Sequence, residues 1–135
     1  MSHDNRQLTR LWFQEVWSRR RTEMIDQMVA SDAIIHGLGD DRRGPAAFGE
    51  FHRMFLGAFP DISVEVNEVI GEGDATAVRF TVRGTHQGDH LGFKATGKPL
   101  LTTGMAWVRW RDGRIIEAWN EFDSAGKIAA MRGPL

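Results

Sequence analysis

Cysteine is absent from the 135 residues of the sequence. This absence excludes disulfide bonds, thiolate metal sites and a cysteine nucleophile. Long apolar runs are lacking too, since no stretch approaches the roughly 20 residues that a helix needs to span a bilayer. The chain starts Met-Ser-His-Asp-Asn-Arg with no apolar segment, so no signal peptide is visible. We therefore expect a cytoplasmic protein without a membrane partner.

The chain also lacks an excess of charge of either sign. Its formal net charge is −1, and this gives no overall field that would attract nucleic acid. Hydrophobic residues make up 41% of the chain, as is usual for a globular protein with a real core. A length of 135 residues suits one domain, and we expect a single domain over residues 1–135.

Periodic apolar positions predict two helices near the start of the chain. Over residues 4–19, apolar side chains recur every three or four residues, which indicates an amphipathic helix with Asp4 as its N-cap. Residues 22–29 repeat the pattern over a shorter length, and Thr22 is in position to cap them. A short β-prone run, residues 33–36, follows and ends at glycines.

A third predicted helix has the heaviest apolar face. It opens at Gly44-Pro45, where the missing proline N–H costs nothing. Four phenylalanines fall on one face of this helix: Phe48, Phe51, Phe55 and Phe59. Such a face needs a deep surface to pack against, and the concave side of a curved sheet would provide one. His52 lies at the edge of the face, and we expect it to be half-exposed at the surface.

Beyond this helix the apolar period changes to two, which predicts strands from Ile62 onward and over residues 75–86. A glycine-rich polar connection, residues 84–99, leads to a final hairpin, residues 102–123. Long connections of this kind often flank functional sites. A last short helix, residues 125–131, is capped by the serine or the aspartate before it. This order predicts an α+β fold with helices on one face of an antiparallel meander.

The loop of the final hairpin decides which residues face the core. Its Arg-Asp-Gly segment, residues 111–113, allows two loop lengths. If all three residues form the loop, Ala106 lies opposite Ala118, and Asn120 shares their face. If Asp-Gly alone forms a two-residue turn, Ala106 lies opposite Trp119, and carboxylates share that face.

Several motifs together resemble one known family. They are His36, Gly44 before a helix, Phe59-Pro60-Asp61, Gly84-Thr85-His86-Gln87-Gly88 with Gly92 and Thr96-Gly97-Lys98, and Asp112-Gly113-Arg114-Ile115 with Glu117, Trp119 and Asp123. In this combination the chain resembles, over most of its length, the SnoaL-like polyketide cyclase family of the nuclear-transport-factor-2-like superfamily. The resemblance implies a cone-shaped, curved antiparallel sheet wrapped around the N-terminal helices, with an apolar pocket inside and dimers common.

The resemblance also implies positions for the chemistry. Cyclases of this family use an aspartate on the last strand and a histidine on the preceding strand for acid/base catalysis. When the hairpin turns are aligned, these positions hold Asn120 and Ala106 in this chain. An amide can polarise a carbonyl or hold an enolate oxygen, but it cannot shuttle a proton. We favour the three-residue loop because it agrees with these family positions.

Four residues are candidates for catalysis: Asn120, His36, His86 and Asp123. The two histidines end predicted strands beside glycines, and histidine can act as a base near neutral pH. Asp123 can orient a histidine or cap the last helix. Glu117 is expected to form a cross-strand ion pair with Arg109 or Arg79 rather than a catalytic contact.

Seven residues are candidates for contact with a substrate: Ala106, Val108, Ala118, Phe122, Phe51, Phe55 and Trp119. Trp119 reaches the pocket only with the two-residue turn. With the longer loop, Trp107 and Trp119 lie on the other face, where a second copy of the chain can cover them. His86, Asp89 and His90 have metal-like helical spacing, but the surrounding glycines argue against a helix, so we expect no metal.

Two functional hypotheses follow. The first is a cofactor-free enzyme of the cyclase, isomerase or hydrolase type, with acid/base chemistry on a small or polycyclic apolar carbonyl compound. The second is an inactive family member that binds an apolar small molecule, motivated by the two missing titratable groups. A purely structural dimer module is a third and weaker alternative.

Overall fold

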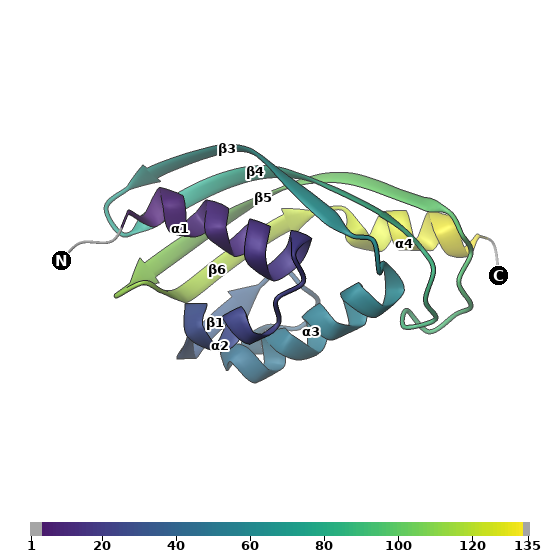
Figure 1. Ribbon diagram of the computed structural model, residues 1–135, viewed down its shortest axis with the longest axis horizontal. Helices are drawn as coiled ribbons and strands as arrows, with labels where there is room; N and C mark the ends of the chain where they lie inside the picture. The colour runs from purple at the N-terminus through teal and green to yellow at the C-terminus, as the bar shows by residue number, and fades with distance from the viewer. Residues whose placement is uncertain (1–3, 134–135) are drawn as a thin grey trace.

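The computed structural model describes residues 4–133 and has an α+β architecture (Figure 1). The helices in chain order are α1 (Asn5–Leu11), the π-helix η1 (Trp12–Ser18), α2 (Glu23–Met28), α3 (Gly44–Ala58) and α4 (Ser124–Arg132). The strands are β1 (Val29–His36), β2 (Arg42–Arg43), β3 (Ser63–Glu72), β4 (Ala75–Thr85), β5 (Pro99–Arg111) and β6 (Arg114–Phe122).

The strands form one curved, unclosed sheet in the order β2-β1-β6-β5-β4-β3. Strands β3 to β6 form the predicted antiparallel meander, whereas β1 pairs with β6 in parallel. Figure 1 shows the sheet arching over α1, α2 and α3, which cover its concave face. The expected α+β fold, with a curved sheet wrapped around helices, is confirmed, and the parallel β1 is the one departure from an antiparallel sheet.

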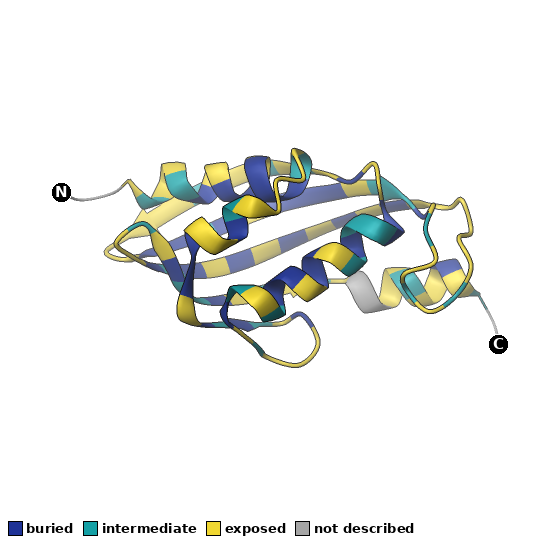
Figure 2. Cartoon of the chain, turned by 60° about the horizontal axis from the view of Figure 1, so that its bottom comes forward, coloured by how far each residue is buried: buried dark blue, intermediate teal, exposed yellow. Residues whose placement is uncertain are grey.

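Burial alternates along the central strands, as a sheet with one covered face requires. Figure 2 shows this alternation as successive bands of buried and exposed residues. On β5 the buried positions are Leu100, Thr102, Gly104, Ala106, Val108 and Trp110. The residues between them lie on the other face, where Met105 and Trp107 are exposed and Arg109 is half-buried.

The first predicted helix forms, but its second half is π-helical. In η1 the hydrogen bonds join residues five apart, as in the bond from the Arg19 N–H to the Gln14 carbonyl (2.8 Å). Trp12 and Trp17, which are five residues apart in this helix, are both buried in the core. Asp4 caps α1 as predicted. The predicted cap at Thr22 is wrong, because its side chain makes no capping hydrogen bond.

The predicted three-residue loop of the last hairpin is wrong. Asp112 and Gly113 both have positive φ (52° and 79°), which is the signature of a two-residue type I′ turn. The pairing then shifts between Arg109 and Trp110, and beyond this bulge Ala106 lies opposite Asn120. The bulge restores the alternation that the shorter turn would have reversed. Ala106, Ala118 and Asn120 therefore share the core face as predicted. Neither predicted pairing is correct, because Ala106 lies opposite neither Ala118 nor Trp119.

No helix in the described part of the chain is long and apolar enough to cross a membrane.

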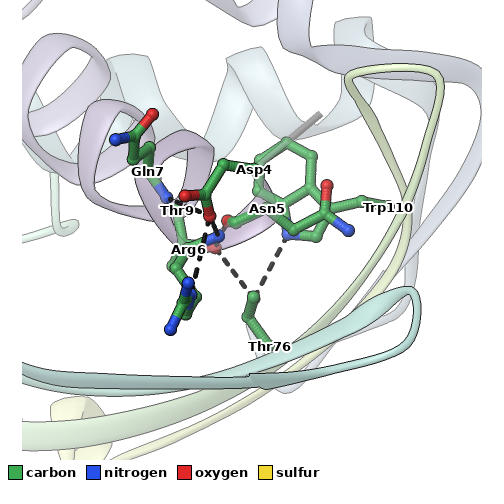
Figure 3. Close-up of polar contacts among 7 residues, drawn as sticks. All are labelled: Asp4, Asn5, Arg6, Gln7, Thr9, Thr76 and Trp110. Atoms are coloured by element: carbon green, nitrogen blue, oxygen red, sulfur yellow. Dashed lines mark hydrogen bonds and ion pairs between the residues drawn. The ribbon is translucent and has the colours of Figure 1, made fainter. Parts of the chain in front are cut away.

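A buried hydrogen-bond network joins α1 to the sheet (Figure 3). The Thr9 hydroxyl donates to the Asn5 carbonyl at 2.7 Å and lies 2.8 Å from the Thr76 hydroxyl. Since Thr9 has already donated its proton, Thr76 donates to Thr9 and accepts from the Trp110 indole N–H at 3.2 Å. Thr76 therefore satisfies two groups that are both removed from water.

We expect Thr76→Val to destabilise the fold by about 1–3 kcal/mol, because the buried Trp110 N–H loses its acceptor and Thr9 loses a donor. Urea unfolding followed by tryptophan fluorescence measures this change. Thr103→Val, at an exposed position of β5, is the matched control and should change stability by less than about 0.5 kcal/mol. Equal effects of the two substitutions would contradict a structural role for the network.

Candidate functional site

An apolar cavity of about 50 Å³ lies between the helices and the concave face of the sheet. Thirteen of the described residues line it; eight of them are aromatic, and Asn120 is the one polar residue among them. The lining consists of Trp12, Phe13, Trp17, Leu38, Phe48, Phe51, Phe55, Ile62, Val64, Phe80, Val82, Asn120 and Phe122. A cavity of roughly 150 Å³ is needed to hold benzene, so a ligand of that size requires part of this wall to move.

The amide of Asn120 has a defined orientation. Its Nδ2 donates to the main-chain carbonyl of His36 at 3.0 Å. A carbonyl can only accept, so the nitrogen and not Oδ1 must face His36. Within residues 4–133, Oδ1 has no hydrogen-bond partner. It is also not one of the fully buried side-chain atoms without a partner, so it is not closed off from solvent. Asn120 therefore offers an open acceptor oxygen at the cavity, together with the second hydrogen of its Nδ2.

The side chain of His36 lies on the opposite face of the sheet and does not line the cavity. It is stacked on Trp119, with ring centroids 5.3 Å apart. Its Nδ1 lies 2.9 Å from Asp41 Oδ1, and its Nε2 lies 2.7 Å from Glu117 Oε2. The hydrogen bonds to Glu117 and then to Asp41 raise the pKa of His36. The two carboxylates therefore favour the imidazolium form of His36, and its place on the other face of the sheet does not suit a base acting in the cavity.

Glu117 does not form the ion pair that was expected of it. Arg109 is its partner across the strands, but the Arg109 guanidinium binds Asp74 at 2.9 Å. The carboxylate of Glu117 binds His36 instead.

His86 is fully buried but also lies outside the cavity lining. Its Nδ1 accepts the main-chain N–H of Thr96 at 3.1 Å. The proton of the neutral ring is then on Nε2, which has no partner among the described residues. The rings of Phe59 and Phe93 flank it.

Asp123 is exposed, and its side chain accepts the main-chain N–H of Gly126 at 3.0 Å. Of the two roles considered for Asp123, the structure shows the cap of the last helix. Asp123 does not line the cavity either.

The seven candidate contact residues divide into three groups. Phe51, Phe55 and Phe122 line the cavity. Three small or branched residues on the same face are buried in the core without lining it: Ala106, Val108 and Ala118. Trp119 is exposed on the other face, beside His36. Sequence reasoning missed nine of the described lining residues: Trp12, Phe13 and Trp17 of η1, and Leu38, Phe48, Ile62, Val64, Phe80 and Val82 elsewhere in the chain. For η1, the run of tryptophans and phenylalanine was the available signal.

His52 is fully buried, so the predicted half-exposed position is wrong. The ring packs against Trp17, with centroids 4.8 Å apart, and Nε2 donates to the Val16 carbonyl at 2.7 Å. The reason for the error is that η1 and the sheet together enclose α3 more widely than its phenylalanine face suggests. Burial lowers the pKa of His52, which the hydrogen bond to Val16 only partly opposes.

A curved sheet closed by helices around an apolar cavity defines the ketosteroid isomerase-like class of fold. A protein of that fold from Catenulispora acidiphila superposes with a TM-score of 0.78 over 95% of this chain and 94% of its own. The two are 13% identical, so the likeness concerns the fold alone.

The chain belongs to the SnoaL-like polyketide cyclase family, which it matches over residues 7–131. It is similar to IdmH of Streptomyces antibioticus, whose proposed role is that of a polyketide cyclase. The two sequences are 27% identical, and the structures superpose over 98% of this chain and 100% of IdmH with a TM-score of 0.81. It is also similar to AclR of Streptomyces galilaeus, whose proposed activity is that of a hydroxylase. The two sequences are 25% identical, and the structures superpose over 99% of this chain and 89% of AclR with a TM-score of 0.82. A comparison with curated proteins finds no match.

We expect His52 to make the fold less stable at acid pH. Its pKa is lowered in the folded state and close to 6.5 in the unfolded chain. The unfolded chain therefore binds the proton more readily, and stability is lost as pH falls from about 7 through the folded pKa.

The free energy of urea unfolding, measured between pH 5 and pH 8, checks this expectation. His52→Gln keeps a donor for Val16 without titrating, so its stability should fall less toward pH 5 than that of the wild type. His90→Gln, at an exposed histidine, should follow the wild-type curve. Parallel curves for wild type and His52→Gln would refute the assignment.

Proposed function

We propose that this protein binds a small, largely apolar molecule in the core cavity, with Asn120 as its polar anchor. One observation carries the proposal: among the described residues that line the cavity, one is polar and the others have hydrocarbon or aromatic side chains. Apolar pockets with few fixed polar groups are the usual form of small-molecule sites. The wall would supply most of the binding free energy through burial, and the amide would select the ligand's orientation.

The orientation of the amide suggests which polar group the ligand carries. Oδ1 of Asn120 is open, while one Nδ2 hydrogen is already used by the His36 carbonyl. A ligand hydroxyl or enol would donate to Oδ1, and a ligand carbonyl would have to accept the remaining Nδ2 hydrogen. We therefore expect a molecule with a hydroxyl or an enolisable carbonyl on an apolar body.

The second candidate function is cofactor-free acid/base catalysis on such a carbonyl compound. Membership of the SnoaL-like polyketide cyclase family and the similarity to IdmH favour it. Asn120 would stabilise the enolate oxygen as a preorganised hydrogen-bond donor. The proton would have to move through water or the substrate itself, because none of the described lining residues can titrate.

Phenol and toluene have nearly the same shape and differ in one hydroxyl, so they test the anchor. We expect the wild type to bind phenol about fivefold more tightly, the equivalent of one net hydrogen bond of about 1 kcal/mol. Asn120→Leu should abolish the preference and leave toluene binding nearly unchanged. NMR titration measures both affinities. Asn67→Leu, which removes an exposed amide on β3, should retain the preference, and an unaltered preference in Asn120→Leu would exclude the anchor.

The same variants distinguish binding from catalysis when the probe is cyclohexanone in D₂O. Catalysed enolisation would exchange the hydrogens next to the carbonyl for deuterium, and mass spectrometry would detect the gain. Deuterium exchange that is faster with the wild type than in buffer, and slower with Asn120→Leu than with the wild type, would support the catalytic function. Exchange at the buffer rate would support a binding protein.

We also propose that the exposed sheet face pairs with a second copy of the chain. Its large apolar residues are Ile70, Leu101, Met105, Trp107 and Trp119. Trp107 and Trp119 lie directly opposite each other on β5 and β6. Ion pairs such as Arg79–Glu68 and Arg83–Glu65 lie across β3 and β4, so a two-fold partner would meet both signs of charge. Such self-complementarity suits an isologous dimer.

Trp107→Glu should convert the dimer to a monomer, because a carboxylate would be buried without a partner at the centre of the interface. Size-exclusion chromatography with light scattering measures the mass. Ala46→Glu places the same charge on an exposed site of α3 and should leave the dimer intact. A monomeric wild type would contradict the proposal.

A further inference from the structure

We infer that His36 is a positioning residue for the cavity: its main-chain carbonyl fixes the Asn120 amide, and its side chain fixes the loop that carries Leu38. The inference rests on the proposed function, since it concerns the same cavity. It adds a link between the cavity and an ionic cluster on the opposite face of the sheet.

The main-chain part of this link is the hydrogen bond from Asn120 Nδ2 to the His36 carbonyl (3.0 Å). It determines which end of the amide faces the cavity. Gly37, the next residue, has φ +89°, and a side chain there would collide with the main-chain oxygen of Asn120. The end of β1 and the Asn120 segment of β6 are therefore in close contact, so a shift of His36 would move the Asn120 side-chain amide.

The side-chain part closes the loop over residues 37–41. Asp41, at the end of this loop, binds His36 Nδ1, and Glu117 on β6 binds Nε2. Both ring nitrogens face carboxylates, which can only accept, so both must carry protons. Leu38 lies within the loop thus closed, is buried and lines the cavity. The imidazolium therefore holds one part of the cavity wall against the sheet.

The charges around His36 favour its protonated form. Asp41 and Glu117 contact it directly, and Asp40 and Glu121 lie in the same loop and on the same strand. The neighbouring arginines have other partners or are exposed. Arg109 binds Asp74, Arg42 donates to the Leu38 and Ala47 carbonyls, and Arg43 is exposed on β2.

Deprotonation should loosen the loop. The stabilisation is fully present below the unfolded pKa of about 6.5, and it is lost as pH rises through the raised folded pKa. One ring nitrogen then becomes an acceptor facing a carboxylate, and that contact turns repulsive. Leu38 and Asn120 should become less ordered, and ligands should bind more weakly at high pH.

The first test needs no ligand. NMR follows the His36 ring, the Asn120 side-chain amide and the Leu38 methyl groups as pH is varied. In the wild type all three should change with one midpoint. In Asp41→Asn the His36 midpoint should move to lower pH, and the other two signals should move with it. Asp74→Asn removes the ion pair with Arg109 and should leave all three midpoints in place.

The second test measures phenol affinity over the same pH range. We expect binding to weaken about 2- to 30-fold as His36 loses its proton, and the midpoint to shift in Asp41→Asn. His36→Gln should bind weakly at every pH, without the transition.

The outcomes separate the two proposals. If the Asn120 and Leu38 NMR signals do not change as His36 titrates, the positioning role is overturned, whether or not phenol binds. If they follow it and phenol fails to bind, His36 organises the cavity as inferred and the proposed ligand-binding function fails. Asp41→Asn retains the histidine, so the test stands even if His36→Gln does not fold.

Discussion

The packing of aromatic side chains from two helices against a curved sheet is the constraint on which the structure depends. Trp12 and Trp17 of η1 contact Phe48 of α3 with ring centroids 5.2 and 6.0 Å apart. Burial of each such ring contributes about 1.5–3 kcal/mol. The sheet must curve to enclose these rings, and the cavity is the space that they leave.

The same constraint explains how polar groups are distributed. A charge inside an aromatic core would lose its hydration without a partner, at a cost of several kcal/mol. The cavity therefore holds an uncharged amide, and the imidazolium of His36 lies on the other face, between Asp41 and Glu117. Because β1 pairs with β6, one residue contacts both environments, through its main chain on one side and its ring on the other.

Much of the fold and part of the site were predictable. Agreement with the family positions identified the face of β5 and β6 that carries Asn120, and the phenylalanine spacing in α3 identified the helix that covers it. The loop of the hairpin was predicted wrongly, because the type I′ turn and the bulge beside Arg109 compensate each other. Local sequence does not reveal such a bulge, since it depends on packing between strands. The burial of His52 was missed because η1 and the sheet enclose it, and neither could be positioned from periodicity.

The sequence by itself determined the class of fold, its family and the apolar character of the cavity. The class of fold follows from the order and period of apolar residues, which act over a few neighbouring positions. The family and its apolar pocket follow from the resemblance that several short motifs carry. Only the tertiary structure decided which polar groups meet. His36 and Glu117 are distant in the chain, and so are His36 and Asn120, and their contacts exist because β1 pairs in parallel with the last strand. That pairing arises from long-range packing of the whole sheet, and no local pattern encodes it.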